Sequence, residues 1–590
     1  MKKPLLLQIL AFVTLATSQA WAQPTSYSPD LDAIAPKAVP NIAPPAALPD
    51  APLPEITASK EVIIKELKRL VFTSNPGAKD LSGNDYTVEV TLEDVRPPNS
   101  LKFRVIVSQY IGEPASMYSL EEMLQEIIVH YRNNDLPIVD VFIPEQEMRN
   151  GILRIAIIES KLGKLKVEGN EFFPTSIFTE NFTLKEGDSI KKSQAIRDAN
   201  WINKNPFRQA ELIFEEGAEQ GTTDVELKVQ DLRPLRVYTG FDNTGNDLTG
   251  DERLSFGVNW GNAFGKDHQL SYQYMTALHQ EWLQSHSGSY TIPINSLRHM
   301  LTFIGSYSTN GADFPDPTQE IDGSSWSIGV RYSIDLPEWK PLKDYNHNLT
   351  LGYDFKRSDN MLMVSQIVAS DSTTDTSQFS LTYSSSYQDP FGSTSFSATM
   401  VGSPGGMTGY NGSTDLRASG AGGATYFYGR VTLNRSTPLP KKFLWTIKSS
   451  AQISGRNLLG GEQLGAGGFS TVRGYDEREA NGDEGFLIST EISTPPINPS
   501  KLLGLVNLPG DQMQFLGFVD YGTLSVKSKS TSSVNPSSSL LSVGYGFRYM
   551  MSTFLTFRFD HGFQLKDTAQ SDLTRRTYNN RSHFALMMTY

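Results

Sequence analysis

The sequence predicts a transmembrane β-barrel of about 16 antiparallel strands, preceded by two small α/β domains. The first observation behind this fold class is an alternation of apolar and polar residues that persists from about residue 236 to residue 590. The second is the N-terminal segment, residues 1–22, which has the charge and hydrophobicity pattern of a secretory signal peptide. The third is that no run of about 18 apolar residues follows this segment, so no membrane-spanning helix is predicted.

The alternation in the C-terminal part of the chain has the period of two that β-strands require. One face of a strand carries Leu254, Phe256, Val258 and Trp260, and the last strand presents Phe584, Leu586, Met588 and Tyr590. A soluble β-sandwich also alternates, but roughly 355 residues rich in Tyr, Phe and Gly, with few charges on one face, are typical of a membrane barrel. At about 22 residues for each strand and its connection, this stretch supplies about 16 strands.

Residues 1–55 predict export followed by a spacer. Two lysines and an apolar run precede an Ala-Trp-Ala cleavage signal, so cleavage is expected before Gln23. Residues 23–55 are dense in Pro and Ala, a composition that favours an extended, semi-rigid linker.

The composition excludes some classes of partner. The chain of 590 residues has a formal net charge of -12 and no cysteine. Because affinity for nucleic acid depends largely on neutralising phosphates, an acidic chain without Lys/Arg-rich runs is not predicted to bind it. Since no disulfide can form, packing and strand pairing must stabilise the exported protein.

Residues 56–160 are predicted to form the first α/β domain. The pattern over residues 62–72 fits a strand and, nearly as well, a short helix after Ser59. A capping box that starts at Ser119, followed by apolar residues at helical spacing, predicts a helix with one buried face. Two strands follow, at 138–143 and 152–158.

Residues 161–232 are predicted to form a second domain of similar plan. The expected elements are a strand at 165–167, a helix at 193–203, and strands at 210–215 and 224–229. Pro206 lies just beyond the helix, where prolines end helices. Neither domain shows a catalytic constellation, so both are predicted to be binding or docking modules.

A long connection between two predicted strands, residues 460–486, is rich in glycine and exceeds the usual hairpin length of about 2–5 residues. Its middle reads Val472-Arg473-Gly474-Tyr475, one Arg among small and aromatic residues. Taken alone, these four residues fit an exposed turn equally well. The length and setting of the segment favour a functional loop.

The sequence contains no catalytic motif that we recognise. The His residues form no His-Glu-x-x-His pair, and Gly-x-Ser-x-Gly does not occur. Gly265-Lys266 resembles the end of a phosphate-binding loop, but Trp260 and Asp267 occupy the positions of its first Gly and its Ser or Thr. We therefore predict a protein that is not an enzyme, binds no nucleotide and uses no metal or cofactor.

The order of signal peptide, Pro-rich linker, two small α/β domains and barrel, with the Val-Arg-Gly-Tyr motif in a late long loop, resembles the two-partner secretion transporters of the TpsB family. That family exports haemolysins and filamentous adhesins, and the resemblance covers nearly the whole chain. Local motifs agree with it: Tyr110-Ile111-Gly112, Ile143-Pro144-Glu145-Gln146, Gly261-Asn262-Ala263-Phe264-Gly265 and Phe518-Val519-Asp520.

The resemblance implies that residues 56–160 and 161–232 are polypeptide-transport-associated (POTRA) domains in the periplasm. Residues 233–590 would be the barrel, set in the lipid bilayer of the outer membrane. The implied partner is an unfolded exoprotein of the TpsA type, a haemolysin or adhesin. POTRA-type domains are similar to modules that capture an extended chain by β-augmentation. The docking residues expected from the motif are Pro144, Glu145 and Gln146.

The resemblance also implies that the loop 460–486 folds back into the barrel, where Arg473 pairs with Asp520 on the wall, beside Phe518. A confined Arg needs a carboxylate that satisfies its fork of donors. Gly474 would allow a tight tip, and Tyr475, next to Val472-Arg473-Gly474, would add an aromatic contact. The implied function is secretion of the exoprotein through the pore.

Two other functions stay open at this stage. An outer-membrane insertase of the same superfamily usually carries more than two docking domains, so two favour export. A passive porin needs no periplasmic domains, and these argue against it. The sequence offers no convincing helix that would plug the pore, and it identifies neither the cargo nor the free strand edge.

Overall fold

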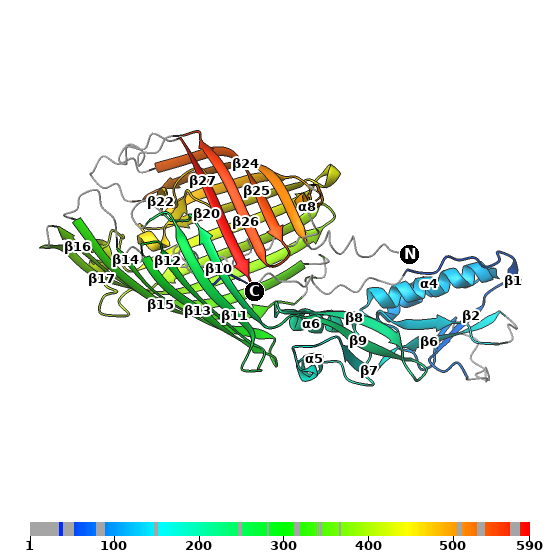
Figure 1. Ribbon diagram of the computed structural model, residues 1–590. Coiled ribbons are helices and arrows are strands. Elements are labelled where there is room, and N and C mark those ends of the chain that lie inside the picture. Colours follow the sequence, from blue (N-terminus) through cyan, green and yellow to red (C-terminus); the bar gives the residue numbers. More distant parts are fainter. Residues whose placement is uncertain are drawn as a thin grey trace. The chain divides into compact units, whose positions relative to one another are not determined.

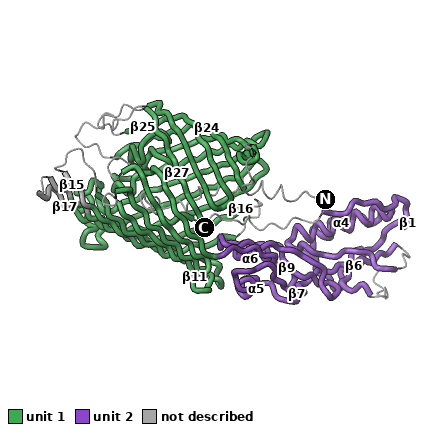
Figure 2. The backbone as a smooth tube through the Cα atoms, viewed as in Figure 1, with its two compact units in different colours: residues 1–40, 234–590 green, residues 41–233 purple. Residues whose placement is uncertain are grey.

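Figure 1 shows the computed structural model of the chain. The structure describes residues 35–38, 52–77, 89–146, 151–245, 250–279, 283–311, 319–337, 339, 342, 345–364, 367–502, 504, 510–527, 537–566 and 579–590. The expected signal peptide lies outside these residues. The chain divides into two compact units, residues 41–233 and residues 1–40 with 234–590 (Figure 2). None of the helices in the described ranges is both long and apolar enough to cross a bilayer.

The first α/β domain is a four-stranded sheet covered by helices. The sheet order is β3-β2-β6-β5, with β2 parallel to β3 and β6 and antiparallel pairing between β5 and β6. Phe72, Phe103, Leu120, Met123 and Tyr131 fill its core. The elements are β1 (Val62–Ile64), β2 (Arg69–Thr73), β3 (Val90–Leu92), α3 (Ser100–Ser108), β4 (Ala115–Ser116), α4 (Met117–Asn133), β5 (Val139–Phe142) and β6 (Ile152–Glu159).

Helix α4 begins earlier than its sequence pattern predicts. The expected N-cap was Ser119, but Ser116 is the N-cap and accepts the backbone N–H of Ser119 at 3.2 Å. Ser119 returns the bond, because its Oγ accepts the N–H of Ser116 at 2.9 Å. A serine at the third helical position thus completes the capping box in place of the more usual Glu or Gln.

The second α/β domain is a three-stranded sheet in the order β7-β9-β8, packed by two helices. Its elements are β7 (Lys161–Glu168), α5 (Thr175–Asn181), α6 (Lys192–Ile202), β8 (Arg208–Glu216) and β9 (Thr222–Asp231). Asp198, fully buried on α6, accepts the N–H and the hydroxyl of Thr183 at 2.6 and 2.8 Å. These bonds hold the connection that follows α5 against α6, since a buried carboxylate must find donors.

Among the described residues, 16 strands close into an antiparallel barrel, which confirms the predicted fold class. The closing pair is β10 and β27, which lie side by side in Figure 1. The strands are β10 (Leu235–Asp242), β11 (Arg253–Ala263), β12 (His268–Ala277), β13 (Leu283–Ile294), β14 (His299–Gly311), β15 (Gln319–Asp335), β16 (Tyr345–Val364), β17 (Ile367–Asp389), β18 (Gly392–Ser403), β19 (Tyr426–Pro438), β20 (Leu444–Ser454), β23 (Glu484–Ser493), β24 (Asp511–Ser525), β25 (Ser537–Met551), β26 (Leu555–Gln564) and β27 (Asn580–Thr589).

The two faces of the wall follow the predicted alternation. On β11, Phe256 is 51% exposed and lies on the outer face, whereas Ser255 and Asn259 are buried and face the lumen. A short stretch of the N-terminal region, residues 35–38, also lies against this inner face. Lys37 donates its N–H to the hydroxyl of Tyr238 at 2.8 Å, and Arg236 donates to the carbonyl oxygen of Ala38 at 3.0 Å.

Candidate functional site

The connection between β20 and β23, residues 455–483, folds back into the barrel. It begins with a short helical turn, η2 (Gly460–Glu462), and its two sides pair as β21 (Leu464–Ala466) and β22 (Ala480–Gly482). Its tip is enclosed, because Val472 and Tyr475 are at most 1% exposed. The residues that follow Gly482 rejoin the wall at once, since β23 starts at Glu484. We call this connection the arginine loop.

The structure brings Arg473 and Asp520 together. The Nε and Nη2 atoms of Arg473 donate to the two carboxylate oxygens of Asp520 at 2.8 and 3.0 Å. The backbone N–H of Arg473 donates to the same carboxylate at 3.0 Å. Such a two-pronged pair fixes the orientation of the guanidinium as well as neutralising its charge. Both side chains are almost wholly buried, at 4% and 0% exposed.

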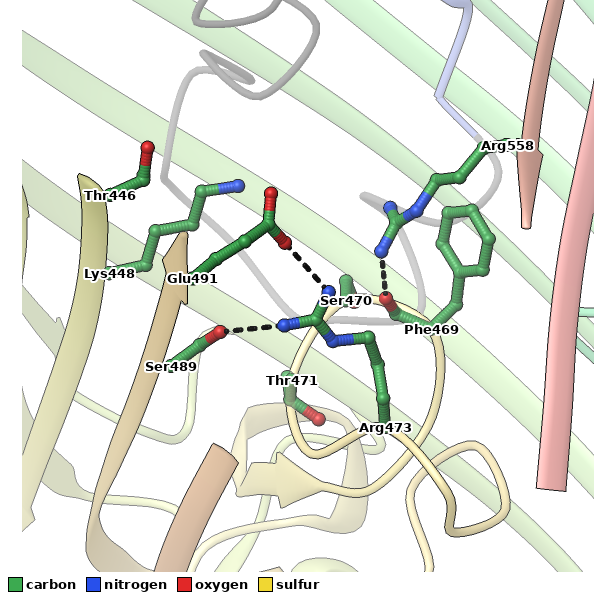
Figure 3. Close-up of a pocket in the computed structure, with 9 residues that line it drawn as sticks. All are labelled: Thr446, Lys448, Phe469, Ser470, Thr471, Arg473, Ser489, Glu491 and Arg558. Carbon is green, nitrogen blue, oxygen red and sulfur yellow. Dashed lines mark hydrogen bonds and ion pairs between the residues drawn. The ribbon is translucent and has the colours of Figure 1, made fainter. Parts of the chain in front are cut away.

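Further acceptors surround the same guanidinium (Figure 3). Nη1 of Arg473 donates to Glu491 at 2.8 Å and lies 3.5 Å from Asp560, and Nη2 donates to Ser489 at 3.2 Å. Ser489 in turn donates to Asp520 at 2.6 Å. Glu491, Asp560 and Ser489 were not predicted from the sequence, because only the closed barrel brings β23, β24 and β26 to one point. Charged residues at inward positions of these strands were the available signal.

Two more arginines balance the carboxylates. Arg548 and Arg558 both donate to Asp560, at 2.9 and 2.6 Å. Arg558 also donates to the carbonyl oxygen of Phe469 at 2.9 Å and stacks on its ring, 3.6 Å from the centroid. This second contact reaches from the wall strand β26 to the arginine loop. The resulting network lines a small pocket formed by Thr446, Lys448, Phe469, Ser470, Thr471, Arg473, Ser489, Glu491 and Arg558 (Figure 3).

The remaining residues of the predicted site also contact Arg473 or its neighbours. The guanidinium of Arg473 lies 3.5 Å from the ring centroid of Phe518, a cation–π geometry. Gly474 has φ +95°, and a Cβ atom there would lie 2.8 Å from the backbone of Gly562. Its N–H donates to Nε2 of His583 at 3.0 Å, and its carbonyl oxygen accepts from Gln564 at 2.6 Å.

Tyr475 and Val472 anchor the two sides of the tip. The hydroxyl of Tyr475 lies 2.7 Å from the carbonyl oxygen of Lys566 and accepts the N–H of Leu541 at 3.2 Å. Val472 belongs to an apolar cluster with Leu464, Ala466, Tyr475, Ala480, Leu487, Leu524 and Leu540. The motif therefore contacts five adjacent wall strands, β23 to β27, through charge, backbone and apolar contacts.

A second buried group holds the base of the arginine loop. Glu462 is 2% exposed and accepts from Lys356 at 2.6 Å and from the hydroxyl of Tyr428 at 2.7 Å. Gln378 lies within 3.4 Å of the same carboxylate. These partners come from β16, β19 and β17, so the loop is fixed to two separated sectors of the wall. Glu462 was not predicted as a functional residue from the sequence.

The expected docking residues lie directly after β5. Gln146 forms three hydrogen bonds within its own domain, two of them to the backbone N–H and carbonyl oxygen of Arg154 at 2.8 and 2.7 Å. Its third bond, at 3.2 Å, goes to the carbonyl oxygen of Pro144. Glu145 is exposed. Of the three residues, Glu145 is therefore the one whose side chain faces solvent.

The fold and the enclosed loop define an outer-membrane barrel transporter with small N-terminal docking domains. Residues 221–549 match the family model of the haemolysin secretion/activation proteins ShlB/FhaC/HecB, and residues 88–160 match the ShlB-type POTRA domain. The chain belongs to this family, which confirms the resemblance to the two-partner secretion transporters of the TpsB type. Its barrel lies in the outer membrane and its POTRA domains in the periplasm, as predicted.

Individual relatives agree with this assignment. The heme/hemopexin transporter protein HuxB of Haemophilus influenzae (strain 86-028NP) is 25% identical over 471 residues, covering 75% of this chain and 77% of the relative. The outer membrane transporter CdiB of Dickeya dadantii (strain 3937) is 20% identical over 420 residues, covering 66% and 68%. The solved structure of CdiB from Escherichia coli has a TM-score of 0.71 at 18% identity, covering 92% of this chain and 94% of that chain.

The close approach of Gly474 and Gly562 yields a test that changes no charge. A Cβ atom at position 562 would lie 2.6 Å from the backbone nitrogen of Gly474. We expect the added methyl group of Gly562→Ala to displace the tip of the arginine loop, because overpacking costs roughly 1–3 kcal/mol. Export should then fall although the amount of barrel in the membrane stays normal. Gly517→Ala on β24 is the matched control, because its nearest neighbour is 3.9 Å away. Equal export by both variants would contradict this packing argument.

The contacts of Gln146 predict that its main effect is on stability. Gln146→Ala removes bonds to both backbone groups of Arg154, so we expect the POTRA unit to lose about 1–3 kcal/mol in urea unfolding of residues 52–233. Glu145→Ala, at an exposed neighbour, is expected to stay within about 0.5 kcal/mol. If Gln146→Ala unfolds like the wild type, these bonds do not stabilise the domain.

Proposed function

We propose that the POTRA domains receive an unfolded exoprotein in the periplasm and that the chain exports it through the barrel, past the arginine loop. The observation that carries this proposal is the enclosed cluster around Arg473, in which one loop residue meets Asp520, Glu491 and Asp560. A passive pore needs no such buried cluster of charged residues. A charged group taken out of water is retained where its position matters or where partners neutralise it.

The inner face of the wall fits the passage of an unfolded chain. Inward positions of β13, β17 and β18 carry small neutral hydroxyl groups: Ser285, Ser287, Thr376, Ser380, Thr382 and Thr399. Their neighbours Phe379, Leu381 and Met400 are exposed on the outer face. Neutral hydroxyls can exchange hydrogen bonds with a passing backbone without holding it strongly, and weak binding is what conduction requires.

Open sheet edges in the POTRA domains support capture by β-augmentation. Strand β5 ends the four-stranded sheet of the first domain, and β8 ends the three-stranded sheet of the second. An added strand can bond such an edge whatever its side chains, which suits an unfolded cargo. We propose Pro144, Glu145 and Gln146 as docking residues, because they directly follow the edge strand β5.

The cargo that we propose is a large secreted exoprotein of the TpsA type, a haemolysin or adhesin. Among the relatives, HuxB is named a heme/hemopexin transporter and CdiB an outer membrane transporter. We propose that the chain acts without covalent catalysis, and that folding of the cargo outside the cell prevents its return. Outer-membrane insertion of other barrels remains the second candidate, and the next experiment separates the two.

The test is deletion of the gene, followed by comparison of secreted proteins and of unrelated outer-membrane barrels. We expect one large exoprotein to disappear while other barrels assemble normally. Reintroduced Arg473→Ala should restore the barrel but little export, because it leaves Asp520 buried without its guanidinium, a loss of about 3–5 kcal/mol. Arg473→Lys is the matched control, because lysine keeps the positive charge but lacks the forked donors of the guanidinium. This variant should also export poorly.

Failure of many barrels after the deletion would identify an insertase instead. Full export by Arg473→Ala, at a normal level in the outer membrane, would contradict the role proposed for the arginine loop.

A further inference from the structure

A second connection also folds into the barrel. Residues 404–425, between β18 and β19, contain the helix α7 (Ser413–Ala418), and we call them the inner segment. Leu416 of α7 is fully buried in an apolar cluster with Val401, Ala421, Ala424, Tyr426, Tyr428 and Leu458. Tyr426 and Tyr428 flank Phe427, which is 59% exposed on the outer face. The alternation of the strand therefore places this cluster, and α7 with it, on the lumen side.

The inner segment occupies an edge of β17 that β18 does not reach. Pairing between these strands ends at Phe379 and Gly402. Beyond that point, Asp375 donates its N–H to the carbonyl oxygen of Tyr410 at 3.0 Å, and its own carbonyl oxygen accepts from Asn411 at 2.8 Å. The hydroxyl of Thr374, on the neighbouring inward position, lies 2.7 Å from that of Ser419.

The inner segment also contacts the base of the arginine loop. Gly422 donates its N–H to the carbonyl oxygen of Asn457 at 2.9 Å, and Leu416 packs in one cluster with Leu458. The bond between Gly422 and Asn457 is neutral. The tip of the arginine loop, by contrast, is held by a guanidinium among three carboxylates. The inner segment has two charge-assisted bonds, one from the hydroxyl of Thr408 to the carboxylate of Asp375 at 2.6 Å and one from Arg456 to the carbonyl oxygen of Thr425 at 3.2 Å. It has fewer such bonds than the tip of the arginine loop and is therefore the more weakly held of the two inserted connections, since charge-assisted hydrogen bonds are stronger than neutral ones.

Glycines at both ends of the inner segment give it the means to move. Gly405 and Gly406 have φ +70° and +69°, and Gly420 and Gly423 have φ +89° and +146°. Glycine adopts such conformations at little cost and changes between them readily. The ladder between β18 and β19 runs without interruption from Ser393 and Ser436 to Ser403 and Tyr426. Displacement of the segment would therefore leave the barrel wall intact.

We propose that the inner segment is a gate, which swings on these glycines away from β17 to admit the exported chain while Arg473 stays bound to the wall. The proposal rests on the export function proposed above. It assigns the moving part to residues 404–425 and the fixed part to the tip of the arginine loop. Lids of this kind move between a closed and an open position about a few hinge residues.

The test is a reversible covalent lock between gate and wall. The chain has no cysteine, so the double variant Thr374→Cys and Ser419→Cys can form only the intended disulfide within the protein. The hydroxyl oxygens of these residues are 2.7 Å apart, close to the separation that a disulfide needs. The matched control is Ser306→Cys with Ser327→Cys, whose hydroxyls are also 2.7 Å apart but which join two paired wall strands.

Export of the exoprotein that disappears on gene deletion is then measured with and without reductant, and disulfide formation is read from mobility on a non-reducing gel. We expect the oxidised gate variant to lose most export and to regain it on reduction. The oxidised control and the variant Thr374→Ala with Ser419→Ala should export like the wild type.

Two results would overturn the gate. One is normal export by the fully oxidised gate variant, which would show that the segment need not leave β17. The other is loss of export by the alanine variant, which would show that the contact itself must persist. In either case, export by the wild type leaves the transport function standing. Absence of any exported protein in the wild type would instead count against the transport function.

Discussion

The buried guanidinium of Arg473 is the interaction on which the site depends. A charge enclosed in the barrel must be neutralised and hydrogen-bonded, or it destabilises the fold by several kcal/mol. Asp520, Glu491 and Asp560 meet that requirement only when β23, β24 and β26 are in register. The arginine loop can therefore take up its position only when the C-terminal strands have closed, so the two features depend on each other. Gly474 and Gly562 contribute to it by allowing two backbones to approach closely.

Much of the fold was predictable from the sequence, because the strands of a membrane barrel alternate apolar and polar residues with a period of two, as β11 and β27 do. The pairing of Arg473 with Asp520 was inferred from family resemblance and is present in the structure. Glu491 and Asp560 were not predicted, since their proximity arises from barrel closure and leaves no local pattern. Helix α3 was missed for another reason. Its residues Leu101 and Val105 are 78% and 72% exposed, so its apolar residues do not mark one buried face.

The barrel wall and its inserted connections differ in how they are held. The wall is a continuous antiparallel ladder, in which every neighbouring pair of strands is hydrogen-bonded. The arginine loop is fixed at its tip by charge and at its base by Glu462 with Lys356. The inner segment is held by a few hydrogen bonds, one of them from Thr408 to the Asp375 carboxylate, and by the apolar cluster around Leu416. The barrel wall and the arginine loop are therefore the rigid parts, and the inner segment is the part that we propose to move.

The central claim is that Arg473 and Asp520 act as one unit in export. A double-mutant cycle with Arg473→Met and Asp520→Asn, read as the amount of cargo secreted at equal barrel levels, tests it most directly. The account predicts non-additive effects, with the double variant exporting no less than the worse single variant, because the first change already removes the pair. Losses that multiply in the double variant would show that the two residues act independently, and would contradict the account.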